Sequence, residues 1–132
     1  MPRPYSLDHC SLLVRDLETS LRFYQDVFGF KIISIEPGHP QIRWLSINGL
    51  GALHLTEGDA KAIHLEKAVH FALSTSDLEG VISDLGARGI PFSDFPGHES
   101  RIGSAPGGYR QIFIQDPDGY WVEINDHGTS AG

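Results

Sequence analysis

Among the histidines and carboxylates of this 132-residue chain, four side chains are candidate ligands for one metal ion. They are His9, His54, His70 and Glu123. Neutral imidazoles and a carboxylate suit Fe(II), Mn, Co, Ni or Zn, and four such ligands on an octahedral ion leave two adjacent positions for a bidentate oxygen ligand. Around each residue, apolar side chains alternate with small or polar ones, as in a strand with one covered face. We therefore expect all four on faces that helices leave uncovered, where they can converge.

An internal repeat relates the surroundings of these residues. A shift of the sequence against itself by 70 − 9 = 61 positions gives five identities within ten residues: His9 with His70, Leu12 with Leu73, Asp16 with Asp77, Leu17 with Leu78 and Glu18 with Glu79. Farther along, LHL at 53–55 and VEI at 122–124 take equivalent places at an offset of 123 − 54 = 69. Such self-similarity indicates one structural unit used twice.

Both halves predict the order strand, helix, three strands. In the first half, Leu17, Leu21 and Tyr24 share a helical face, Asp16 is an expected N-cap, and Gly29 ends the helix. The predicted ranges are a strand at 7–14, a helix at 16–29 and strands at 31–36, 41–47 and 51–57, then a strand at 68–75, a helix at 77–89, a short strand near 90–93 and strands at 109–115 and 120–126.

The second half carries an insertion. Its extra residues must lie in the loop SDFPGHESRIGSAPGG at 93–108, which is rich in Gly, Pro and Ser. A loop of this length is either a lid or binding loop or a plain surface insertion, and the sequence leaves both open. Each half is too short to bury much core alone, so we expect one domain rather than two.

Composition limits the partners. A net charge of −7, with ten Lys and Arg that do not cluster, argues against DNA or RNA. No apolar run approaches the roughly 20 residues of a membrane span, and the first residues lack the apolar core of a signal peptide, so we expect a cytoplasmic protein. Cys10 is the only cysteine, which excludes an intrachain disulfide. A small molecule is the expected partner.

Three segments resemble the vicinal oxygen chelate superfamily, which includes glyoxalase I, bleomycin-resistance proteins and extradiol dioxygenases. They are LDHCSLLVRDLETSLRFYQDVFGF, HFALSTSDLE and QIFIQDPDGYWVEIND, within a resemblance over 7–126. The resemblance implies an α+β fold in which two βαβββ modules form a curved, incompletely closed mixed β-sheet barrel with helices outside. The implied single domain, 1–132, comprises module 1 at about 5–57, a connector at 58–67, module 2 at about 68–126 and a tail at 127–132.

The same resemblance assigns roles to the four residues. It places a divalent transition metal, Zn, Ni, Co, Fe or Mn, on His9, His54, His70 and Glu123, and it implies no other cofactor. His54 departs from the family, because glyoxalase I usually carries Glu and the epimerases Gln at this position. We expect it to be a ligand, a base or a pocket residue. Glu123, the only carboxylate of the set, is the expected catalytic acid or base, with His54 as the second catalytic candidate.

Three classes of function remain open. The first is a lyase or isomerase of the glyoxalase type, acting through proton transfer and a metal-stabilised enediolate. The second is a ring-cleaving dioxygenase. The third is a resistance protein, either a non-catalytic binder of the bleomycin-sequestering type or a thiol transferase of the fosfomycin type. Pure binders usually lack the metal ligands that this chain keeps, which favours an enzyme. We expect a homodimer, with modules paired within a chain or exchanged between chains.

Other polar residues are expected to serve the surface or the fold. His39, His64, His98 and His127 fall in turns, in the connector or in the tail. Cys10 lies on the strand face opposite His9, which indicates a core thiol. Asp116 and Asp118 belong to a predicted tight turn between the last two strands.

Overall fold

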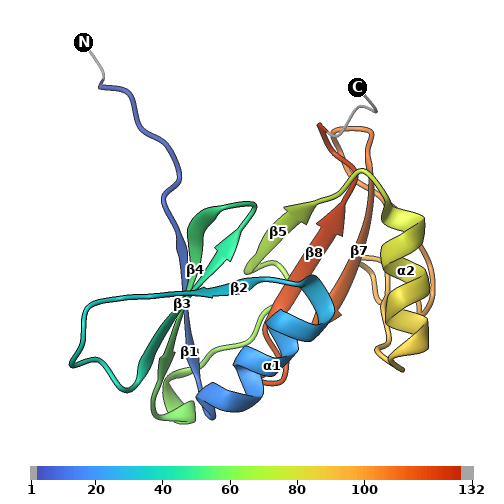
Figure 1. Cartoon of the computed structure of the whole chain (residues 1–132). Helices are drawn as coiled ribbons and strands as arrows, with labels where there is room; N and C mark the ends of the chain where they lie inside the picture. Colours follow the sequence, from blue (N-terminus) through green and yellow to red (C-terminus); the bar gives the residue numbers. More distant parts are fainter. Residues whose placement is uncertain (1–2, 129–132) are drawn as a thin grey trace. The chain divides into compact units, whose positions relative to one another are not determined.

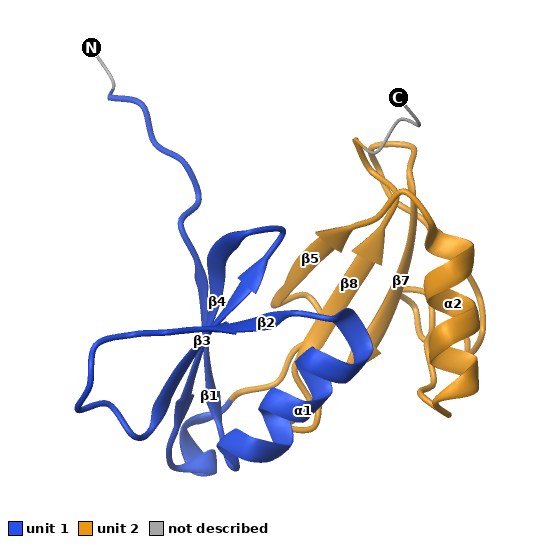
Figure 2. Cartoon of the chain, viewed as in Figure 1, with its two compact units in different colours: residues 1–63 blue, residues 64–132 orange. Residues whose placement is uncertain are grey.

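The computed structural model of the chain describes residues 3–128 and divides into two compact units, Met1–Ile63 and His64–Gly132 (Figure 2). In the described residues, each unit contains one α-helix and one four-stranded mixed sheet (Figure 1). The elements of unit 1 are β1 (Cys10–Val14), α1 (Leu17–Phe28), β2 (Lys31–Ile33), β3 (Ile42–Ile47), β4 (Leu50–Glu57) and the 3₁₀ helix η1 (Ala60–Ala62), and those of unit 2 are β5 (His70–Ser74), α2 (Leu78–Ala87), β6 (Gly103–Ser104), β7 (Arg110–Gln115) and β8 (Trp121–Asn125). The predicted α+β class with two βαβββ modules is confirmed.

The sheet of unit 1 has the strand order β1-β4-β3-β2, with β1 parallel to β4 and the other pairs antiparallel. The predicted cap of α1 is confirmed, because the Asp16 carboxylate accepts the N–H groups of Glu18 and Thr19. Gly29 ends the helix with φ of 71°, a conformation that glycine adopts at little cost. The core is built from apolar residues of α1, β1, β3 and β4: Leu12, Val14, Leu17, Leu21, Tyr24, Leu45, Leu53 and Leu55.

The sheet of unit 2 repeats this pattern with the order β5-β8-β7-β6, and β5 is parallel to β8. Asp77 caps α2 by accepting the Gly80 N–H. Val122 and Ile124 on β8 are buried, as are Leu78 and Leu85 on α2. The predicted turn before β8 is confirmed, because the Asp116 carboxylate accepts the N–H groups of Asp118 and Tyr120.

One predicted strand is wrong. The short strand expected near 90–93 is absent from the described residues, and β6 lies at Gly103–Ser104 instead. Ser93 forms only isolated bridges, to Phe113 and Glu99. The physical reason is Asp94, whose buried carboxylate accepts the N–H groups of Gly97 and His98 and turns the chain before a ladder can extend. The long loop therefore begins as a closed turn.

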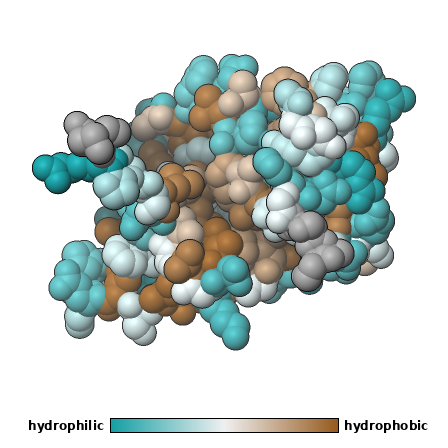
Figure 3. Space-filling model, turned by 90° about the horizontal axis from the view of Figure 1, so that it is seen from above, coloured by the Kyte–Doolittle hydropathy of each residue, from teal (hydrophilic) through white to brown (hydrophobic). Residues whose placement is uncertain are grey.

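Several large apolar side chains remain at the surface. Tyr5, Leu7, Leu50 and Val69 are among the most exposed. Figure 3 shows hydrophobic residues interspersed with hydrophilic ones over the visible face. In the part of the chain that the structure describes, no helix has both the length and the apolar character of a bilayer span.

Candidate functional site

His9 and His54 meet in unit 1. The parallel register places Ser11 beside His54, so His9, two residues earlier, lies toward the same sheet face. The two imidazoles stack with centroids 3.9 Å apart and planes at 18°. On the other side of His54, Trp44 stands directly opposite on β3 and stacks at 4.0 Å and 2°. His54 is thus the middle ring of a three-ring stack.

Hydrogen bonds determine which imidazole nitrogens remain available in this stack. His54 Nε2 lies 3.1 Å from the Gly51 carbonyl oxygen, and a carbonyl only accepts, so Nε2 carries the proton. His9 Nδ1 lies 2.6 Å from Asp8 Oδ1, to which it donates. His9 Nε2 and His54 Nδ1 are left as the possible metal-binding or proton-accepting atoms. Burial lowers the pKa of His54, which favours its neutral ring.

The stacked arrangement limits what His9 and His54 can do together. An ion bound to an imidazole lies in the plane of the ring, along the nitrogen lone pair. Two rings lying face to face with planes 18° apart have no nearby point common to both planes. In this arrangement only one of the two can bind a given ion. His54 is held on both faces and at Nε2, whereas the His9 side chain is 39% exposed.

His70 and Glu123 meet in unit 2. The parallel register pairs Ala72 with Glu123 and His70 with Trp121, so both side chains point to the face opposite the buried Val122 and Ile124. His70 Nε2 lies 3.0 Å from Glu123 Oε1, and the side chains are 22% and 8% exposed. The second carboxylate oxygen accepts from the Asn125 side-chain amide.

The His70 ring is oriented by the backbone. Its Nδ1 lies 2.8 Å from the Lys67 carbonyl oxygen and must therefore donate. In a neutral ring this leaves the Nε2 lone pair directed at a carboxylate oxygen, so either a proton or a metal ion must lie between these two atoms. Two ligand atoms at right angles, each about 2.1 Å from one ion, lie about 3 Å apart. The pair therefore fits a metal ion, and an anchored Nδ1–H is the usual arrangement of a metal-binding histidine.

The predicted residues thus form two pairs, one in each unit. Within residues 3–128, no three His, Cys, Asp or Glu side chains gather closely enough to hold a metal ion among themselves.

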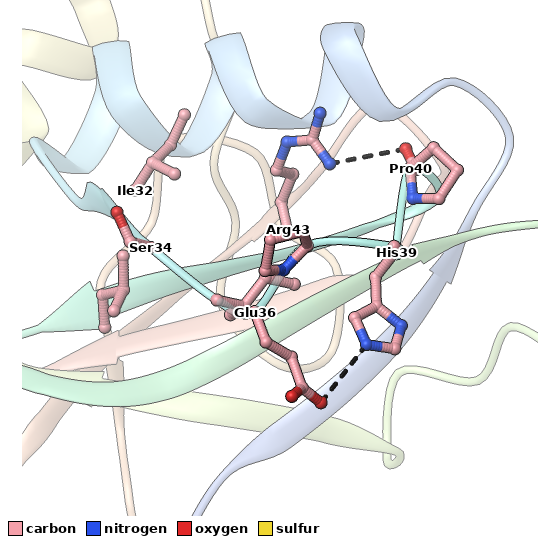
Figure 4. Close-up of a pocket in the computed structure, with 10 residues that line it drawn as sticks. Ile32, Ser34, Glu36, His39, Pro40 and Arg43 are labelled. Atoms are coloured by element: carbon pink, nitrogen blue, oxygen red, sulfur yellow. Dashed lines mark hydrogen bonds and ion pairs between the residues drawn. The ribbon is translucent and has the colours of Figure 1, made fainter.

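A cavity of about 540 Å³ lies elsewhere in unit 1, around the connection from β2 to β3 (Figure 4). Its walls include Ile32, Glu36, His39, Pro40 and Arg43, and none of the four candidate residues. His39 pairs with Glu36 at 3.5 Å, and an Arg43 Nη1–H donates to the Pro40 carbonyl at 3.4 Å. Because none of the candidate ligands lines this cavity, we do not assign it to the candidate site.

The other residues assigned to the surface or the fold have local partners or exposed side chains. His64 is largely exposed, His98 pairs with Asp94, and the His127 ring stacks on Tyr109. Cys10 is partly buried, and burial raises the pKa of its thiol.

Sequence reasoning missed the residues that orient the candidate ligands. Asp8, Lys67 and Asn125 were not assigned to the site, and Trp44 was not linked to His54. Asn125 follows Glu123 by two residues on one strand and so shares its face, a signal that was available. The contact of His54 with Trp44 depends on the β3–β4 register, which one sequence does not reveal.

The chain has relatives among known proteins. The family model for the Glyoxalase/Bleomycin resistance protein/Dioxygenase superfamily matches residues 6–124. A lactoylglutathione lyase of Haemophilus influenzae is 30% identical over 136 residues, covering 94% of this chain and 95% of that one. The uncharacterized protein YwbC of Bacillus subtilis is 29% identical over 124 residues, covering 89% and 94%.

A solved structure has the same fold. Oxidase ChaP-H2 superposes with a TM-score of 0.73 over 98% of this chain and 100% of that one, at 21% sequence identity. At this identity the likeness concerns the fold alone. The match of the family model over nearly the whole chain confirms the resemblance seen in the sequence. The chain belongs to the Glyoxalase/Bleomycin resistance protein/Dioxygenase superfamily.

Proposed function

We propose that this protein is a metal-dependent enzyme of the glyoxalase type, a lyase or isomerase that acts on a small molecule with adjacent oxygens. The observation that carries the proposal is the His70–Glu123 pair, in which an anchored imidazole directs its free nitrogen at a buried carboxylate. The relationship to a lactoylglutathione lyase over most of both chains supports the reaction class.

The proposed metal ligands are His9, through Nε2, and the pair His70 and Glu123. The metal is a divalent transition ion such as Zn, Ni, Co, Fe or Mn. His54 would be a fourth ligand only if its ring left the stack, so we assign it to the pocket as a neutral residue with Nδ1 free to accept a proton. The proposal requires the modules to pair, within one chain or by exchange between two chains of a homodimer.

Such an ion, when bound, acts as a Lewis acid that stabilises negative charge developing on a carbonyl oxygen of the substrate. The protein's own groups move the proton. Asn125 donates to Oε2 of Glu123, and Oε1 faces His70, so Glu123 would act as the base once Oε1 loosens from the metal. Oε1 would then accept the proton from the carbon next to the carbonyl and return it to the neighbouring carbon. His54 Nδ1 is the second proton acceptor in this proposal.

Elemental analysis of protein purified without added metal or chelator tests the proposal. We expect near-stoichiometric transition metal in the wild type. The control variant His64→Ala, which changes an exposed histidine of unit 2, should bind the same amount. His70→Ala and Glu123→Gln should each weaken metal binding at least about tenfold, because even residues that only hydrogen-bond to a ligand have effects of this size. Unchanged metal content in both variants would refute the assignment.

Proton transfer can be followed separately. With an α-hydroxycarbonyl substrate in D₂O, the metal-loaded enzyme should exchange the proton next to the carbonyl, as measured by NMR. Glu123→Gln should not exchange it even when excess metal saturates the variant.

A ring-cleaving oxygenase is the second candidate. Two histidines and one carboxylate form the usual ligand set of nonheme iron oxygenases, which is the observation in its favour. Iron as the bound metal, with oxygen consumption in the presence of a catechol, would favour it. A protein that stays metal-free after reconstitution would instead favour a non-catalytic binder.

A further inference from the structure

The ammonium group of Lys67 is held between the segment before β5 and the long loop of unit 2. Nζ donates to Ser93 Oγ at 3.0 Å and to the Asp94 carbonyl oxygen at 2.7 Å. Three aromatic rings surround it, those of Trp121 at 4.6 Å, Phe113 at 5.3 Å and Phe95 at 5.8 Å from Nζ to the ring centroid. A lysine on an ordinary surface has no such set of partners, so these contacts fix its side chain.

The backbone of the same residue orients a proposed metal ligand. The Lys67 carbonyl accepts the His70 Nδ1–H at 2.8 Å, across a turn closed by the bond from the Val69 N–H to the Glu66 carbonyl. Lys67 therefore hydrogen-bonds to the long loop through its side chain and to His70 through its backbone carbonyl. Movement of the side chain would move the acceptor that determines which nitrogen of His70 faces Glu123.

The walls around Lys67 are also part of the candidate site. Phe113 stands opposite Glu123 in the β7–β8 register, and its ring meets the His70 ring edge-on at 5.2 Å. Trp121 stands beside His70 in the β5–β8 register. The loop residue that accepts from Lys67 is itself held in place. The buried Asp94 carboxylate accepts the N–H groups of Gly97 and His98 and so closes the turn. The Lys67 contacts and the His70–Glu123 pair share one packed sheet face.

We propose that Lys67 is a positioning residue, whose clamped ammonium group fixes the 66–70 turn so that His70 directs Nε2 at Glu123. Burial lowers the pKa of Lys67, which agrees with an ammonium group withdrawn from solvent into these contacts. The effect on metal binding rests on the proposed function, whereas the orientation of His70 does not.

Two measurements on the full chain test this inference. The first is ¹⁵N NMR of the His70 ring in metal-free protein, assigned by comparison with His70→Ala. The second is the affinity for Zn²⁺. The variants are Lys67→Met, which keeps the stem and removes the charge, Lys67→Arg, which keeps the charge, and Lys61→Met, an exposed control in the connector.

In wild type and Lys61→Met we expect His70 Nδ1 to carry a proton whose exchange with solvent is slowed by the hydrogen bond to the Lys67 carbonyl. In Lys67→Met we expect that protection to be lost, the two tautomers to mix, and Zn²⁺ affinity to fall about tenfold, with at least partial recovery in Lys67→Arg. A generally destabilised protein would not change the tautomer of one histidine selectively. If Lys67→Met does not fold, Ser93→Ala removes one acceptor of the ammonium group and should change the His70 signals in the same direction.

Unchanged His70 signals in folded Lys67→Met would overturn the inference. Its failure is distinct from failure of the proposed function. If His70→Ala loses zinc while Lys67→Met matches the wild type in both measurements, only the role of Lys67 is wrong. If His70→Ala binds zinc normally, the metal assignment is wrong, and the NMR signals still decide whether Lys67 orients His70.

Discussion

The two modules present equivalent positions with different chemistry. His54 on β4 and Glu123 on β8 occupy matching places in the repeat, and each stands opposite an aromatic residue of the neighbouring strand, Trp44 or Phe113. The His54 imidazole stacks on that aromatic ring. The Glu123 carboxylate instead turns to Asn125, whose side-chain amide donates to Oε2, and to His70, whose Nε2 faces Oε1. One changed residue type therefore gives a ring stack in unit 1 and a largely buried imidazole–carboxylate pair in unit 2.

The link from the last strand to the helix also differs between the modules. Glu57, just past His54, accepts the Leu17 N–H at the start of α1 directly. Its counterpart in unit 2, Asp126, reaches α2 through Arg110, which also donates to Glu79. Unit 1 thus joins its last strand to the helix by a hydrogen bond to the helix N-terminus, and unit 2 by ion pairs of Arg110. Both modules have the connection, but the interaction that makes it differs.

The largest expected effect concerns the equivalent core residues next to the two candidate ligands. Leu55 and Ile124 are 0% and 2% exposed, and truncation of either to Ala should lower the free energy of unfolding by about 2–5 kcal/mol. We propose that the modules form one domain, so both variants should shift a single urea transition, followed by circular dichroism. Leu50→Ala, at a position 69% exposed, is the control and should change stability by less than about 0.5 kcal/mol. Two separate transitions, each sensitive to one variant, would contradict the one-domain proposal.

The next effect separates the two stacked histidines of unit 1. His9→Ala should weaken metal binding at least about tenfold, because it removes a proposed ligand. His54→Ala should retain metal affinity within about threefold, because the stack keeps the His54 ring from being a ligand. It should lose activity, because it removes the proposed proton acceptor Nδ1. Isothermal titration with Zn²⁺ and the proton-exchange assay measure the two properties. Equal losses of affinity in both variants would make His54 a fourth ligand and would show that the stack opens when metal binds.

The smallest effect concerns the charged link of unit 2. Hydrogen bonds from Arg110 lower the pKa of Glu79 and of Asp126, so the network stabilises the fold above the ordinary carboxyl range near pH 4 and loses this contribution as the pH falls through the lowered values. Arg110→Met should therefore be slightly less stable than wild type at pH 7 in low salt, and the difference should shrink in acid. Thermal unfolding at several pH values measures it.

Arg101→Met, at an exposed loop position, serves as the control for this comparison. A difference between Arg110→Met and wild type that stays constant between pH 7 and pH 2 would show that Arg110 acts through packing rather than charge. Because the Arg110 and Glu79 side chains are exposed, added salt should also reduce the stability difference between wild type and Arg110→Met.

The sequence by itself determined the repeated module and the faces of its strands. The 61-residue repeat, the Asp16 cap and the alternation around His54 and Glu123 are local patterns, and they predicted two βαβββ modules with the candidate ligands opposite the core. Periodicity is sufficient for this because side-chain direction in a strand follows from residue spacing alone.

Only the tertiary structure decided which groups orient those ligands. The stack of His54 on Trp44 depends on strand register, and the contacts of Lys67 depend on where a loop 26 residues away returns to the sheet. The expected strand near 90–93 failed for the same reason, because the hydrogen bonds of the Asp94 turn competed with strand pairing. Non-local contacts bring together residues whose spacing in the sequence carries no signal of their proximity, so their geometry appears only when the chain is folded.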